Sequence, residues 1–142
     1  MNKERLLKII EDMKECVADI DECIEVLGKD NNDKIIIKLA KSSLRQLFVS
    51  FHTILEDFSS IVLKELKKFK VGITLSESLS ILRESNVFDE ETYVFLEKSR
   101  LIRNRISHRY KEPNHEELVT HIGKYRDKLD VIIEIAKGYL NS

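Results

Sequence analysis

The residues best suited to chemistry lie in one stretch, residues 103–110, whose sequence is RNRISHRY. Arg100 and Lys111 extend its positive charge, and no acidic residue lies between Glu97 and Glu112. The chain as a whole has a formal net charge of −1, so this excess of positive charge is local. A histidine beside arginines, with no carboxylate close to it in the sequence, is better suited to binding a phosphate than to holding a metal ion.

Two side chains of this stretch, Arg103 and His108, have the properties that RNA cleavage without a metal requires. Histidine gives or takes a proton near neutral pH. Arginine presents a rigid fork of donors to phosphate oxygens and stabilises the charge that grows on them. The ribose 2′-OH would be the nucleophile, which predicts a 2′,3′-cyclic phosphate product. The alternative is a solvated helix end, whose Arg and His side chains favour the C-terminal dipole while Tyr110 packs its ring.

The spacing of these residues on a helix leaves their pairing open. Asn104 and His108 are four residues apart and share a face, and Arg103 and Ser107 share a neighbouring face. Arg103 and His108 diverge by about 140° on an ideal helix. They can meet at one substrate if the side chains reach round a groove, if the helix end is distorted, or if a second copy of the chain completes the site.

The elements that position this stretch are predicted to be helices. The chain is 42% hydrophobic and 35% charged, with four glycines and one proline, so helix breakers are rare. Apolar residues recur at alternating spacings of three and four over residues 6–27, 37–61 and 118–139. Long helices with short connections fold back on one another. We therefore expect an all-α antiparallel bundle of about five helices, formed by residues 1–142 as one domain.

The second of these segments has more apolar surface than one contact needs. The additional side chains are Phe48, Leu55, Val62 and Leu66. This pattern indicates either a central helix that is contacted on two sides or a face that meets a second protomer.

Capping residues predict where the helices begin and end. Gly28 is suited to end the first helix. Thr74, Asp89 and Asn114 are suited to begin three further helices. The helix from Thr74 should end near residue 85, and the helix from Asp89 should stop by about residue 112, before the only proline. The helix from Asn114 is expected to run unbroken to residue 139.

The remaining candidate residues favour no cofactor or metal. Cys16 and Cys23 would lie about 10 Å apart along one helix, too far for a disulfide, which is typical of a reduced, cytoplasmic protein. His52 is interpreted as a partly buried polar residue, and His115 and His121 are assigned no function. No apolar run approaches the length of a membrane span, roughly 18 residues.

The pattern Arg103-Asn104-x-x-x-His108-x-Tyr110 resembles the Arg-x-x-x-x-His-x-Tyr motif of HEPN domains, in particular the HepT toxins of HEPN–MNT toxin–antitoxin pairs. The resemblance covers nearly the whole chain. It implies a HEPN-like helical bundle that dimerises and sets both motifs in one cleft along the two-fold axis. It also implies that Arg103 and His108 are catalytic and that Asn104 is their polar companion. The family often has two apolar residues before the histidine, and Ser107 departs from this pattern. We expect Ser107 to be a supporting polar residue beside His108.

The resemblance further implies a partner and a modification. Tyr110 matches the tyrosine that an MNT-type nucleotidyltransferase antitoxin modifies with AMP, which would add negative charge beside the cleft and repel RNA. Charge alone predicts that four further residues contact the RNA backbone. They are Arg100, Arg105, Arg109 and Lys111.

The sequence thus predicts a metal-independent endoribonuclease toxin that acts as a homodimer and is neutralised by a cognate nucleotidyltransferase. Two other functions stay open. One is a non-catalytic HEPN-like subunit that binds nucleotide or substrate for a nucleotidyltransferase. The other is a purely structural helical dimer.

Overall fold

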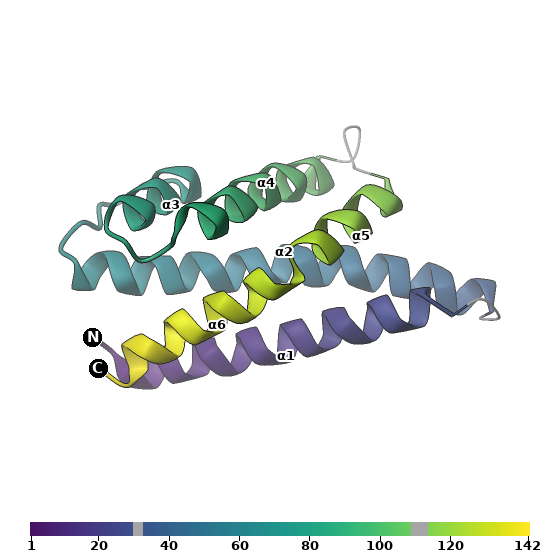
Figure 1. Ribbon diagram of the computed structural model, residues 1–142, viewed down its shortest axis with the longest axis horizontal. Coiled ribbons are helices and arrows are strands. Elements are labelled where there is room, and N and C mark those ends of the chain that lie inside the picture. Colours follow the sequence, from purple (N-terminus) through teal and green to yellow (C-terminus); the bar gives the residue numbers. More distant parts are fainter. Residues whose placement is uncertain (30–32, 109–113) are drawn as a thin grey trace.

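The computed structural model describes residues 1–29, 33–108 and 114–142, and within these ranges every regular element is a helix. The helices are α1 (Lys3–Leu27), α2 (Lys34–Glu65), α3 (Leu75–Glu84), α4 (Glu90–Ser107), α5 (His115–Lys124) and α6 (Arg126–Leu140). Figure 1 shows α1 and α2 as a long antiparallel pair, with α3 and α4 on the other side of α2 and α6 returning across α1. The prediction of an all-α antiparallel bundle is confirmed.

The helix starts follow from side-chain caps. Thr74, Asp89 and Asn114 each accept a hydrogen bond from a backbone N–H of the first helical turn, as the sequence predicts. Asn2 and Asp33 do the same for α1 and α2. These bonds satisfy donors that have no partner within the helix, so each cap fixes where its helix begins.

The expectation of one unbroken final helix is wrong. The chain leaves helical geometry at Tyr125, with φ −113° and ψ 19°, and this residue separates α5 from α6. The described residues therefore contain six helices, where about five were expected. The Tyr125 ring packs 5.2 Å from the ring of Phe95, and its hydroxyl lies 3.0 Å from Nζ of Lys98, so the joint is held against α4. Beyond the joint, α6 turns onto α1.

The core is formed by apolar side chains of all six helices. Phe48, Leu55 and Val62 of α2 are buried within the chain, and Leu66, which caps α2, is partly buried against the core. Since α1, α3 and α4 all contact α2, the central-helix interpretation is correct for this face. The large apolar side chains of α2 that stay exposed lie in its first turns. They are Ile35, Ile36 and Leu39.

Candidate active site

The motif lies at the end of α4, and the helix end is distorted. Asn104 and Arg103 are in the last turns, and His108 is the cap, with φ −108° and ψ 90°. The His108 N–H still donates to the Asn104 carbonyl oxygen at 3.1 Å. The backbone leaves helical geometry at His108, and this residue is exposed at the helix end. Arg109, Tyr110 and Lys111 lie outside the described residues.

Arg103 is held by two oxygen atoms. Its Nη1 lies 3.0 Å from Oε1 of Glu56 on α2, and its Nε donates to Oδ1 of Asn104 at 3.2 Å. The side chain is only 19% exposed. Within the described ranges, Nη2 forms no hydrogen bond. The guanidinium is thus fixed at two of its three nitrogens and keeps donors for an incoming oxyanion.

Glu56 is a residue that sequence reasoning missed. It lies 47 residues before Arg103 in the chain, and α2 packs against α4 to bring the two together. The only signal in the sequence is a carboxylate that follows His52 by one helical turn, which does not reveal a partner on another helix.

The described arginines of this stretch are each paired with a carboxylate. Arg100 Nη2 lies 3.0 Å from Glu97, and Arg105 forms a two-point contact with Glu117 of α5, at 2.6 and 3.0 Å. The Arg105 guanidinium holds the pKa of the Glu117 carboxyl below its usual range. Any contact of these arginines with RNA would have to compete with the carboxylates. Ser107 is exposed at the end of α4.

A buried histidine lies one turn before Glu56. His52 is 1% exposed, so the expectation of partial burial is wrong. Its Nδ1 is 2.8 Å from the Phe48 carbonyl oxygen, and since a carbonyl only accepts, Nδ1 carries the proton. Its Nε2 is buried without a partner in the described structure. Burial lowers the pKa of His52 to about 4, so the ring is neutral at pH 7.

A second buried histidine joins α5 to α4. Nε2 of His121 lies 2.7 Å from Oγ of Ser99, and its ring stacks on Phe95 with centroids 5.4 Å apart. Burial lowers the pKa of His121 to about 4. His52 and His121 are therefore packed, neutral groups, and His108 differs from both because its ring is exposed.

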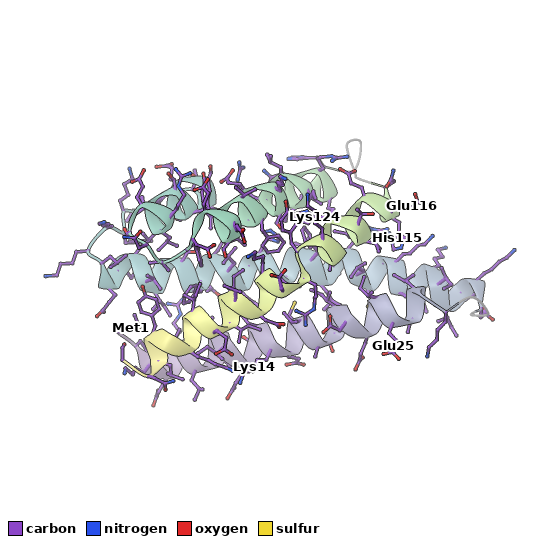
Figure 2. The ribbon with its side chains drawn as sticks, viewed as in Figure 1. Met1, Lys14, Glu25, His115, Glu116 and Lys124 are labelled. Carbon is purple, nitrogen blue, oxygen red and sulfur yellow. The ribbon has the colours of Figure 1, made fainter. Side chains whose placement is uncertain are left out.

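His115 begins α5, where Figure 2 shows it beside Glu116. Burial, followed by the charges of Lys41 and Arg45, lowers its pKa. Among the described residues, no group of three or more His, Cys, Asp or Glu side chains is arranged to hold a metal ion. None of the helices in the described ranges has the length and apolar character needed to cross a membrane.

Comparison with known proteins gave a family match. A family model described as Ribonuclease HepT-like matches residues 6–136, which include all six helices apart from the ends of the first and last. Comparisons with curated proteins and with solved structures gave no match. The resemblance inferred from Arg103, Asn104, His108 and Tyr110 is thereby confirmed at the level of the family. The chain belongs to the Ribonuclease HepT-like family.

Proposed function

We propose that this protein is an endoribonuclease toxin that cleaves RNA without a metal ion and uses Arg103 and His108 as its catalytic residues. The observation that carries the proposal is how the Arg103 guanidinium is held. Glu56 and Asn104 accept hydrogen bonds from two of its nitrogens, while the N–H groups of Nη2 stay available within the described residues. A guanidinium that is already fixed loses little further freedom when it binds a phosphate. Membership of a ribonuclease family supports the same chemistry.

In the proposed reaction, His108 takes the proton of the 2′-OH, and the 2′-oxygen attacks the adjacent phosphorus. The bond between phosphorus and the 5′-oxygen breaks, and the imidazolium returns its proton to that oxygen. The products are a 2′,3′-cyclic phosphate and a 5′-hydroxyl end. Arg103 stabilises the negative charge on the non-bridging oxygens as the new bond forms.

The proposal includes a dimer in which Arg103 of one protomer and His108 of the other serve one cleft. Arg103 is turned toward α2, whereas His108 is exposed at the helix end. Exposed apolar side chains at the start of α2 and on α4 offer a surface that a second copy would bury. They include Ile35, Leu39 and Leu101.

The toxin role and its control rest on the family and on Tyr110. A cognate nucleotidyltransferase that attaches AMP to Tyr110 would place negative charge near the cleft and repel RNA. Intact-mass measurement after co-expression with such a partner should show AMP addition. The Tyr110→Phe variant should not gain this mass, and modification of that variant would contradict the assignment.

An RNA cleavage assay in excess chelator tests the activity. The wild type should degrade RNA and leave 2′,3′-cyclic phosphate ends, and Arg103→Ala and His108→Ala should not. His115→Ala is a matched control, because it removes an imidazole outside the motif, at the start of α5, and should keep activity. Equal cleavage by His108→Ala would contradict the proposal. An inactive wild type that binds a nucleotidyltransferase tightly would favour the non-catalytic subunit.

A further inference from the structure

A second feature near the motif is an open groove between α4 and α5, with a volume of about 680 Å³. One end is at Asn114, which follows the motif segment in the chain, and the other is at Tyr125, where α5 meets α6. Figure 2 shows Glu116 and Lys124 toward the two ends of α5, and both line the groove. The groove therefore extends from the motif end of α4 toward the joint between α5 and α6.

Two ammonium groups and a phenol meet at the Tyr125 end. Nζ of Lys98 donates to the Tyr125 hydroxyl oxygen at 3.0 Å, and Nζ of Lys124 lies 5.2 Å from the centroid of the Tyr125 ring. The hydrogen bond from Lys98, followed by the charge of Lys124, holds the pKa of Tyr125 below its ordinary value. With its oxygen accepting from Lys98, the phenol still has its own proton to donate.

These lysines differ from the motif arginines in what balances their charge. Arg100, Arg103 and Arg105 each contact a carboxylate, whereas Lys98 and Lys124 form no ion pair with the carboxylates of the described residues. At the other end of the groove, Glu117 is already neutralised by Arg105, and Glu116 is the remaining carboxylate. The concentrated positive charge of the groove is therefore at the Tyr125 end.

The ring of Tyr125 is already enclosed by other groups. The rings of Phe95 and His121 both lie 5.2 Å away, and the two lysines lie near its surface. A base that stacked on this ring would have to compete with these groups. The groups that remain for a ligand are two ammonium groups and a hydroxyl, which match the oxygens of a phosphate.

We propose that Lys98, Lys124 and Tyr125 form a phosphate-binding subsite for the backbone of the RNA substrate, an inference that rests on the proposed ribonuclease function. Lys98 precedes His108 by ten residues, about 15 Å along a helix axis. The subsite therefore binds a phosphate distant from the bond that is cleaved. Its role is to hold the strand, and it takes no part in the chemical step.

The test compares binding and cleavage in the full chain. The variant Lys98→Gln/Lys124→Gln should bind a fully 2′-O-methylated, uncleavable RNA oligonucleotide more weakly than the wild type, measured by fluorescence anisotropy over a salt series. The slope of log affinity against log salt should become shallower by about 0.7 for each lost phosphate contact. In cleavage assays KM should rise while kcat stays close to the wild-type value.

Two further variants separate charge at this site from charge in general. Lys128→Gln/Lys137→Gln makes the same change in net charge, but these lysines are paired with Glu91 and Glu134, so the affinity and the slope should change little. Lys98→Arg/Lys124→Arg keeps both charges and should retain most of the affinity.

The outcomes distinguish the subsite from the proposed function. If the wild type cleaves and binds RNA but Lys98→Gln/Lys124→Gln binds with the same affinity and slope, the subsite is wrong and the ribonuclease stands. Equal weakening by Lys128→Gln/Lys137→Gln also overturns the subsite, because the effect would then be one of net charge. If the wild type binds no uncleavable RNA and cleaves none, both proposals are overturned.

Discussion

At the scale of single residues, the contacts of Arg103 determine what its guanidinium can still bind. Nε donates to Asn104 and Nη1 donates to Glu56, while Nη2 forms no hydrogen bond within the described residues. A carboxylate beside a phosphate-binding arginine has two opposite consequences. It orients the guanidinium, and it competes with the phosphate for the same charge. Since Glu56 uses only one of the three nitrogens, we expect orientation to be the larger effect.

The first prediction therefore concerns Glu56. Glu56→Gln keeps the shape and an acceptor oxygen but removes the charge, so Arg103 should be held less firmly and kcat for RNA cleavage should fall about tenfold, equivalent to about 1.4 kcal/mol. KM should change less than kcat. Asp57→Asn, at the adjacent position and paired with Arg5, is the matched control and should behave as the wild type. Faster cleavage by Glu56→Gln would show that the carboxylate competes with RNA.

The same residues show how far the sequence alone could lead to the site. Arg103, Asn104 and His108 are neighbours in the chain, so their spacing and types identified the candidate site. The partner of Arg103 was not predictable, because an ion pair between α2 and α4 depends on how two helices pack. For the same reason the sequence indicated an unpaired cluster of arginines, although Glu56 and Glu117 form ion pairs with two of them from other helices.

At the scale of the helices, the sequence predicted where helices begin but did not predict a break at a single residue. Caps at Thr74, Asp89 and Asn114 depend on hydrogen bonds within one turn, so the sequence was sufficient to place them. The break at Tyr125 involves one residue with non-helical angles, and the apolar spacing of three and four continues across it. Contacts with Phe95 and Lys98 of α4 accompany the break, and these are tertiary contacts that periodicity does not report.

The second prediction concerns the buried histidines that pack between the helices. In the folded state the pKa values of His52 and His121 are about 4, and their ordinary value is 6.5. Between these values the unfolded chain binds protons that the folded chain does not, so stability falls as the pH falls from 6.5 toward 4. Within this window each histidine should cost about 1.4 kcal/mol per pH unit.

Urea unfolding at several pH values between 7.5 and 4.5 would measure this dependence. His52→Leu replaces the imidazole with an apolar side chain of similar size and removes one titrating group, so the stability of the variant should depend less steeply on pH. In this variant the Phe48 carbonyl oxygen loses its contact with the imidazole ring. It still accepts the helical hydrogen bond from the backbone N–H of residue 52, four positions later. A free energy of unfolding that is the same at pH 7 and pH 5 in the wild type would contradict the prediction.

At the scale of the whole molecule, the proposed reaction requires Arg103 and His108 to reach one phosphate. Arg103 is turned into the contact between α4 and α2, while His108 is exposed where α4 ends. A two-fold dimer would bring His108 of one protomer to Arg103 of the other, and the exposed apolar residues at the start of α2 would supply buried surface.

The last prediction follows from the proposed shared site and uses two variants that are each expected to be inactive. Arg103→Ala and His108→Ala should each be inactive alone. When equal amounts are mixed and the protomers exchange, a mixed dimer carries His108 on the first protomer and Arg103 on the second, which together form one complete cleft. The mixture should therefore regain a substantial fraction of the wild-type RNA cleavage.

The double variant Arg103→Ala/His108→Ala, mixed with either single variant, is the control, because no cleft in that mixture holds both side chains. If exchange is verified by mass and the mixture of single variants stays inactive, both residues must act from the same chain, and the shared cleft would be wrong while the catalytic assignment stands.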